Sequence, residues 1–298
     1  MVMMEGRAQP ASRIKAFELR RSLNIASVAF ALMLTLLAVA HAQLLQVEHG
    51  FEFGGLPQLV RLKGVEAPFI RGVRIYTDAN ILRPGRYDPV GSHNESNPKV
   101  TRKVERSNGA EVVVMESVGQ LKDAQKQPCG LSYRFTYSTS TDGASLLIDA
   151  SVYAERDFDA MHGFLALVFP FDGATEWFAL TASGWLFCDI TKSGRVFQTS
   201  QTPMTEEWII GVANFHSGYG IVIRLLQCVP RDSVDNVIIH TNVGGSGGIF
   251  IAWCDGITSR PMRSGESWRV RLVLQFMPLA EFERMIETRE VGMSSPAG

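Results

Sequence analysis

The order of apolar and polar residues after residue 110 is typical of β-strands. Val112–Met115 is a short apolar run, and apolar and polar residues alternate over residues 131–138. Alternation with a period of two places one face of a strand on a core and the other in water. The turn-rich segment Ser138–Gly143 ends in Asp-Gly, and alternation resumes over residues 145–153. This order predicts a β-hairpin over residues 131–153.

Further apolar segments rich in β-branched and aromatic residues follow, separated by Gly, Pro, Asn, Asp and Ser. They predict strands at residues 164–169, 176–180, 184–190, 208–213, 220–228, 237–241, 248–254 and 268–276. After Pro278, the helical spacing of Leu279, Phe282 and Ile286 predicts one short helix. Many strands without alternating helices predict an all-β chain, a large antiparallel β-sandwich with a short C-terminal helix.

Two segments have the composition of loops. Residues 78–108 are poor in apolar residues, and 83–98 are rich in Pro, Gly, Asn and Ser, which predicts a long loop. Gly244–Gly248 is glycine-rich, but strand-like residues flank it on both sides. A phosphate-binding loop needs a helix N-terminus, so this segment is predicted to be a hairpin loop.

The first 42 residues have the three parts of an export signal. An apolar stretch, Ile25–Ala40, is followed by the small-x-small pattern Ala40-His41-Ala42, and four basic residues come before it: Arg13, Lys15, Arg20 and Arg21. The stretch is shorter than the roughly 20 residues of a membrane-spanning helix. We therefore expect cleavage after Ala42, a secreted or periplasmic protein and no stable membrane span. An uncleaved signal that anchors the chain is the alternative.

Removal of residues 1–42 leaves one predicted β-sandwich domain, 43–288, and a flexible tail, 289–298. The formal net charge of the 298 residues is −1, and Lys and Arg are scattered among acidic residues. Nucleic-acid binding needs clustered positive charge, so that class is excluded.

The four cysteines, Cys129, Cys188, Cys228 and Cys254, permit two disulfides in an oxidising compartment. None has the C-x-x-C spacing of a zinc or redox site, so no metal is expected. A domain of this size does not need disulfides, and the last three cysteines lie in apolar strand-like segments, which favours buried thiols.

Strong catalytic motifs are absent: the sequence has no G-x-S-x-G, H-E-x-x-H, Walker loop or dinucleotide fingerprint, and no cofactor is predicted. His162 and His216 lie near glycine at the ends of predicted strands. A histidine in a loop held by rigid strands suits a general acid or base, so both are candidates for catalysis. A turn residue that binds backbone groups is the other interpretation of each.

Aromatic and acidic residues form a second set of candidates. Trp253 and Asp255 close one predicted strand, Trp177 begins another and Trp185 lies in a third. Indole rings stack on the C–H faces of sugars and carboxylates accept hydrogen bonds from hydroxyl groups, so these four residues are candidate ligand-binding residues. Tryptophan in a sandwich core is the competing interpretation.

Residues 155–190, 208–226 and 263–272 resemble the galactose-mutarotase-like β-supersandwich, in which a Gly-Glu-Ser turn, here Gly265–Ser267, precedes a long final strand. The resemblance implies a carbohydrate ligand. Epimerases of this group pair a His acid with a Glu base, which implies His162 or His216 as the acid. Glu176, Glu207 and Glu266 are the candidates for the base, although none stands in a recognisable motif.

The leading hypothesis is a secreted, non-catalytic carbohydrate-binding β-sandwich. Two other functions fit the same residues. One is a carbohydrate-active enzyme, an aldose epimerase or a polysaccharide-lyase-like protein, with a His acid or base. The other is a structural or interaction domain of the cell envelope.

Cleavage of the export signal is directly testable. We expect the exported protein to begin at Gln43, which N-terminal sequencing or intact mass measurement of the secreted or periplasmic fraction would detect. A protein that reaches the envelope with residues 1–42 intact would instead be anchored by them.

Overall fold

The computed structural model describes residues 45–50, 54–78, 89–107, 109–158, 165–190, 196–198, 208–229, 236–243, 248–255 and 262–285. These residues form 18 strands in one hydrogen-bonded network, a 3-10 turn and a helix over residues 279–285. The predicted all-β class and the short C-terminal helix are confirmed. Within this part of the chain, no helix is long and apolar enough to cross a bilayer. The expected signal, 1–42, and tail, 289–298, lie outside the described residues.

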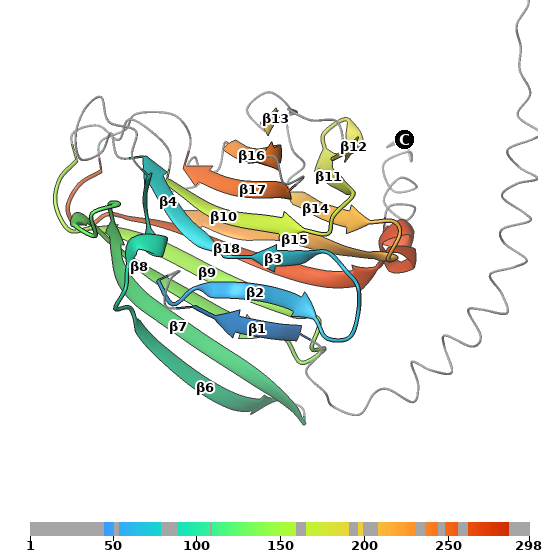
Figure 1. Cartoon of the computed structure of the whole chain (residues 1–298), viewed down its shortest axis with the longest axis horizontal. Helices are drawn as coiled ribbons and strands as arrows, with labels where there is room; N and C mark the ends of the chain where they lie inside the picture. The colour runs from blue at the N-terminus through green and yellow to red at the C-terminus, as the bar shows by residue number, and fades with distance from the viewer. Residues whose placement is uncertain are drawn as a thin grey trace, which may run out of the picture. The chain divides into compact units, whose positions relative to one another are not determined.

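The first layer is a wholly antiparallel sheet (Figure 1). In spatial order its strands are β6 (Lys99–Ser107), β7 (Ala110–Lys122), β8 (Pro128–Thr139), β9 (Ser145–Ala154), β18 (Ser267–Pro278), β15 (Tyr219–Val229), β14 (Ile209–Asn214), β11 (Glu176–Thr181) and β12 (Gly184–Asp189). The last strand in sequence, β18, therefore lies between β9 and β15.

The second layer is built around β10 (Leu165–Asp172). One edge of β10 pairs with β17 (Gly248–Asp255), which continues to β16 (Asn236–Val243) and β13 (Val196–Gln198). The other edge pairs with β4 (Arg74–Asp78) and β3 (Phe69–Arg71), which lead to β5 (Pro89–Gly91) and to β2 (Pro57–Leu62) and β1 (Leu45–His49). β5 also pairs with β7, so the layers join at that corner.

The alternating segments form the hairpin that the sequence predicts. In β8, Leu131, Tyr133, Phe135 and Tyr137 are buried, while the residues between them are more exposed. β8 pairs with β9 from Leu131–Ala154 to Thr139–Leu146. In the turn, Asp142 accepts hydrogen bonds from the N–H groups of two following residues, which fixes the reversal.

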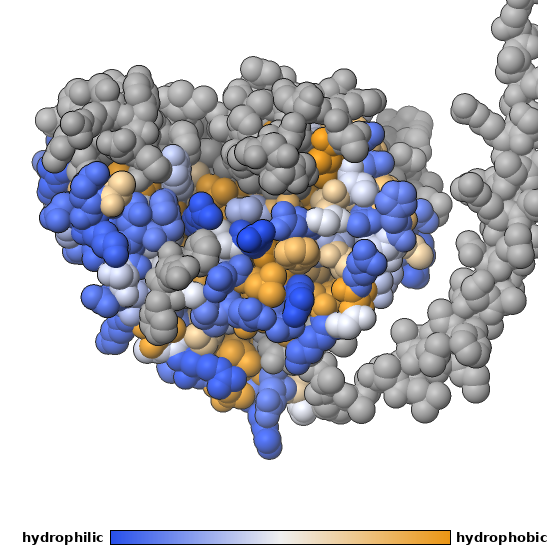
Figure 2. Space-filling view, in the orientation of Figure 1, coloured by the Kyte–Doolittle hydropathy of each residue, from blue (hydrophilic) through white to orange (hydrophobic). Residues whose placement is uncertain are grey.

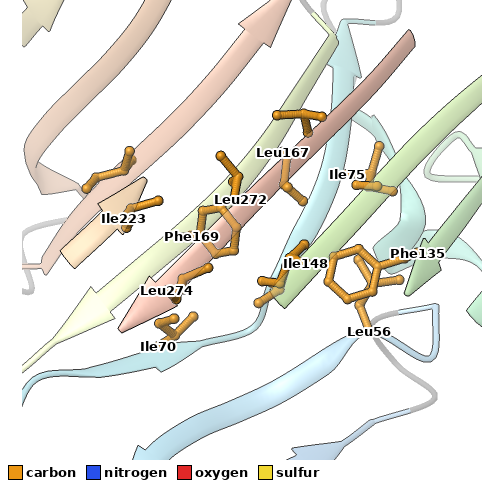
Figure 3. Packing of buried hydrophobic residues seen from close by; sticks show 14 of the residues in the cluster. Leu56, Ile70, Ile75, Phe135, Ile148, Leu167, Phe169, Ile223, Leu272 and Leu274 are labelled. Carbon is orange, nitrogen blue, oxygen red and sulfur yellow. The ribbon is translucent and has the colours of Figure 1, made fainter. Parts of the chain in front are cut away.

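The main core lies between the two layers (Figure 3). Leu167 and Phe169 of β10 and Ile75 of β4 point from the second layer toward Leu272 and Leu274 of β18 in the first. All five side chains are fully buried. Because side chains alternate along each strand, this core uses one face of each strand.

A smaller apolar cluster covers the far face of the first layer. Leu279 and Phe282 of the helix pack against Phe178 and Leu180 of β11 and Met277 of β18. Leu279 and Phe282, whose spacing predicts the helix, are therefore the side chains that pack the helix against the sheet.

The strands that precede residue 110 were not predicted. β6 is the clearest case, because eight of its nine residues are exposed and the ninth, Val100, is intermediate. An edge strand that is exposed to solvent on both faces carries charged residues on both faces. Its sequence therefore has no apolar alternation. The predicted loop at 83–98 is also shorter than expected, since β5 and a 3-10 turn, η3 (Ser92–Asn94), lie within it.

The cysteine side chains that the structure describes, Cys129, Cys188 and Cys228, are thiols, as the sequence favours. Burial raises the pKa of Cys129 to about 11, so this thiol stays protonated and packs as a small apolar group.

The inter-layer core should dominate stability. We expect Leu274→Ala, at a fully buried position, to lower the free energy of unfolding by about 2–5 kcal/mol. Gln275→Ala, its neighbour on the opposite face, should change it by less than about 0.5 kcal/mol. Urea denaturation of both variants measures this, and equal losses would contradict the assignment of the core face.

Candidate functional site

A group of polar side chains lies at one end of the second layer, where β4 and β5 pair. Val73, Ile75 and Thr77 are fully buried. Alternation along the strand therefore places Arg74 and Tyr76, both half-buried, on the opposite face of β4. The two residues thus lie beside each other on the face that does not form the inter-layer core.

His93 joins these residues from the turn after β5. Gly91 pairs with Tyr76 across the ladder, and a Cβ atom at residue 91 would lie 2.6 Å from Nδ1 of His93. Glycine at this position therefore lets the imidazole lie against the backbone. The preceding Ser92 is fixed as well, because its hydroxyl accepts a hydrogen bond of 3.1 Å from the N–H of Ile75.

A buried carboxylate holds the turn from its other side. Glu95 accepts hydrogen bonds from the N–H groups of Asn97 and Gln120 and from Nζ of Lys122 at 2.9 Å. Burial alone would raise the pKa of Glu95, but these hydrogen bonds outweigh it and the pKa is lowered. Glu95 is thus ionised at neutral pH and anchors the segment that carries His93.

The electrostatics keep His93 neutral near pH 7. Burial and the charge of Arg74 both lower the pKa of His93. Its ring stacks on Tyr76, with the centroids 6.3 Å apart and the planes 14° apart. Nδ1 of His93 is buried and has no hydrogen-bond partner among the described residues. A neutral imidazole with an unused nitrogen can donate or accept a hydrogen bond.

The register places Trp253 and Asp255 at the same end of the layer. Asp255 pairs with Leu165 and Trp253 pairs with Leu167, while Thr77 of β4 pairs with Leu165 from its other side. The backbones of Thr77, Leu165 and Asp255 therefore form one row across three strands. The structure describes the backbone of Trp253 and Asp255 and not their side chains.

His162 lies outside the described residues, three positions before Leu165 in the sequence. His216 is described, in the exposed turn between β14 and β15. This turn is tied to Gly173, just beyond β10, by a hydrogen bond of 2.5 Å from Nδ2 of Asn214. β10 spans eight residues, about 23 Å at a rise of about 3.3 Å per residue. His216 is therefore at the opposite end of β10 from the row that contains Asp255.

Trp177 and Trp185 pack in the interior instead of meeting this group. Trp177 is 3% exposed and belongs to the main core. Trp185 lies edge-on to Phe178 and Phe282, with centroids 6.1 and 5.9 Å away, beneath the C-terminal helix. The structure thus gives both indole rings a packing role.

The candidate glutamates are also dispersed. Glu176 pairs with Asp189 across β11 and β12, and burial together with the charge of Asp189 raises its pKa. Glu266 is exposed and accepts a hydrogen bond from the N–H of Arg263 in the turn before β18. Glu207 and Gly244–247 lie outside the described residues. Across the described side chains, no group of three His, Cys, Asp or Glu could hold a metal ion.

The architecture is shared with solved structures. A protein of Klebsiella pneumoniae subsp. pneumoniae MGH 78578 assigned as an aldose 1-epimerase matches with a TM-score of 0.53 and 9% identity, over 83% of this chain and 81% of that one. The chain has the galactose-mutarotase-like fold. The fold that the sequence resemblance implies is thereby confirmed.

Two other solved structures have lower TM-scores. A galactose mutarotase-like protein from Lactobacillus casei ATCC 334 has a TM-score of 0.48 and 10% identity, over 78% of this chain and 97% of its own. A GH36 α-galactosidase from Geobacillus stearothermophilus has a TM-score of 0.42 and 13% identity. The match covers 68% of this chain and only 30% of that protein. No protein-family model matches the sequence, and a search of the curated proteins finds no match.

Sequence reasoning missed Arg74, Tyr76 and His93. The sequence predicts a long loop over residues 83–98, which hides the turn after β5, and no strand was predicted at β4, which precedes that segment. The signal available was Gly91-Ser92-His93-Asn94-Glu95, a run of small and polar residues that includes a histidine. Its proximity to Arg74 depends on the β4–β5 pairing, which one sequence does not reveal.

The electrostatic coupling between Arg74 and His93 can be measured. We expect NMR titration to give His93 a pKa below that of a free imidazole, about 6.5, and Arg74→Gln to raise it part of the way back. His49, whose pKa burial lowers and which has Arg102 as its charged neighbour, serves as an internal control that should not move. An unchanged His93 in Arg74→Gln would contradict the coupling.

The lowered pKa values also set a direction for stability. His93 and His49 have lowered pKa values in the folded protein and a pKa of about 6.5 in the unfolded chain. Between the lowered values and about pH 6.5, the unfolded chain binds more protons than the folded protein. The free energy of unfolding therefore decreases as the pH falls below about 6.5. Thermal unfolding of the wild type and of His93→Gln from pH 7.5 to 5 should show a smaller loss in the variant.

Proposed function

We propose that the protein is an exported carbohydrate-binding protein, and that its sugar site lies at β4 and the turn after β5. The observation that supports this is the half-buried group of Arg74, Tyr76 and His93. It lies on a fold shared with a protein assigned as an aldose epimerase.

The three side chains have the chemistry that sugar recognition needs. The guanidinium of Arg74 is a planar array of donors for hydroxyl oxygens, and an imidazole can exchange hydrogen bonds with a hydroxyl group. The Tyr76 ring offers an apolar face for the C–H side of a sugar ring. Partial burial strengthens these hydrogen bonds, because fewer waters compete for the same groups.

Trp253 and Asp255 pair with Leu167 and Leu165, so strand alternation places them on the core face of the second layer, opposite to Arg74 and Tyr76. They are therefore not part of the proposed sugar site. His162 precedes β10 by three residues and lies outside the described residues. His216 is excluded from this site by its place at the other end of β10.

An aldose epimerase is the second candidate function. His93 is neutral near pH 7, which suits acceptance of a proton from a sugar hydroxyl. In this alternative, His93 is the base, and His162, which lies outside the described residues, is the candidate for the acid. A non-catalytic binding protein needs the same residues without that proton transfer.

Ligand-detected NMR and calorimetry with galactose and glucose test the proposal. We expect saturable binding that Arg74→Gln and His93→Gln each weaken at least about tenfold, or about 1.4 kcal/mol. His216→Gln, at an exposed turn on the opposite end of β10, is the matched control and should bind as the wild type does.

Polarimetry of freshly dissolved α-anomer then separates the two functions. Faster mutarotation that is lost in His93→Gln identifies an epimerase, and binding without acceleration identifies a binding protein. Absence of both binding and acceleration would overturn the proposal and favour a structural or interaction domain of the envelope.

A further inference from the structure

A polar cavity lies at the edge of the sandwich, away from Arg74 and His93. It has a volume of about 210 Å³ and lies between β1 of the second layer and β6, β7 and β8 of the first. Its floor includes Val113 and Met115 of β7, both buried. In Figure 2, hydrophilic side chains lie over apolar ones in the region of β1, β6 and β7.

The lining of this cavity carries positive charge and no negative charge. Arg102, which pairs with Met115 across β6 and β7, and Lys63, just after β2, both line it, and no Asp or Glu does. Neither cation forms a salt bridge with another described residue. Two cations at a concave surface, without a counterion among the described residues, favour an anion.

His49 and Tyr137 form the polar wall. Nε2 of His49 lies 2.5 Å from the Tyr137 hydroxyl oxygen, and the rings stack with their centroids 5.4 Å apart. Nδ1 of His49 is 3.3 Å from the Gly55 carbonyl oxygen, which can only accept, so Nδ1 carries the proton in the neutral ring. Nε2 therefore accepts the hydrogen bond and the Tyr137 O–H donates it.

Protonation of His49 would reverse this hydrogen bond. Nε2 would then donate to the Tyr137 oxygen, and the Tyr137 O–H would become available to a bound group. The charged or titratable side chains around His49 in the cavity are Lys63, Arg102 and Tyr137. An anion bound beside them would oppose the effect of Arg102, which lowers the pKa of His49 together with burial.

The backbone of β1 adds a donor. The N–H of Leu45 donates to the Gly143 carbonyl and not to β2. Backbone groups alternate between the two edges of an antiparallel strand, so the N–H of Val47 points to that same edge, away from β2. Val47 also lines the cavity.

We propose that this cavity binds a small oxyanion, a carboxylate, sulfate or phosphate group, through Lys63, Arg102, the Val47 N–H and the Tyr137 hydroxyl. Its volume is below the roughly 300–1,000 Å³ of pockets for drug-sized ligands. It therefore accommodates a free anion or one acidic group of a larger ligand such as an acidic sugar. The proposal does not rest on the sugar site at Arg74 and His93.

NMR titration of the folded protein at constant ionic strength tests the proposal. Sodium sulfate, phosphate, acetate and galacturonate are added separately, with galactose as the uncharged counterpart of galacturonate. We expect saturable shifts of His49 and Tyr137 signals with the anions and none at this cavity with galactose. A response to sulfate or phosphate alone identifies a free inorganic anion, and one to galacturonate and acetate identifies a carboxylate ligand.

The anion affinity of two variants distinguishes binding in this cavity from a general effect of surface charge. Lys63→Gln combined with Arg102→Gln changes two exposed residues and should weaken binding at least tenfold. Lys103→Gln, the next residue on β6, which strand alternation places on the other face, is the matched control and should retain wild-type affinity.

The His49 pKa gives a second readout. Saturating anion should raise it in the wild type and leave it unchanged in the double variant. Non-saturating shifts, or equal weakening by Lys103→Gln, would overturn the proposal. Arg74→Gln should leave anion binding intact, so failure of the sugar site and failure of this site are distinguishable.

Discussion

The structure depends on one constraint, the burial of alternate side chains of β10 against the first layer. Leu165, Leu167, Phe169 and Phe171 are all fully buried, and they belong to the same core as Leu272 and Leu274 of β18. A shift of β10 by one residue would turn this whole set away from the core. Its register is therefore strongly fixed, and so is that of every strand that pairs with it.

The candidate sugar site inherits its geometry from this constraint. β4 pairs with one edge of β10, so the fixed register places Tyr76 at one end of the layer. The face of β4 that is not needed for the core is then available to Arg74 and Tyr76. His93 reaches them because Gly91 leaves space for its ring. A rigid sheet thus supports polar groups at its strand ends, as in many binding proteins.

The edge of the sandwich offers a different physical environment. The first layer extends past β1 to β6, whose outer position leaves Arg102 and Val104 exposed on the inner face of the sheet. The cavity at His49 arises because the first layer extends beyond the edge of the second layer. Its cations and the buried hydroxyl of Tyr137 make it electrostatically unlike the Arg74–His93 group, where the guanidinium of Arg74 lies beside a neutral histidine. Two sites of different chemistry are therefore compatible with one framework.

The sequence by itself determined the fold class, the hairpin at residues 131–153 and the C-terminal helix. Those features depend on local periodicity, since the alternation in β8 and the spacing of Leu279 and Phe282 are visible without knowledge of any partner. It did not identify β6, whose residues are nearly all exposed, or the strands around Arg74. The edge strand β6 buries too little apolar surface to leave a pattern, and β4, although Ile75 is fully buried, has too few alternating positions to be recognised.

Only the tertiary structure decided which polar residues meet. Trp177 and Trp185 suit sugar stacking by residue type, but packing buries one in the core and covers the other with the helix. His216 and Asp255 both lie at strand ends, and the direction of β10 places them at opposite ends. Arg74 and His93, and likewise His49 and Tyr137, are brought together by strand pairing and layer packing between distant segments. Residue type and local pattern carry no information about such pairings, because they arise from the register of the whole sheet.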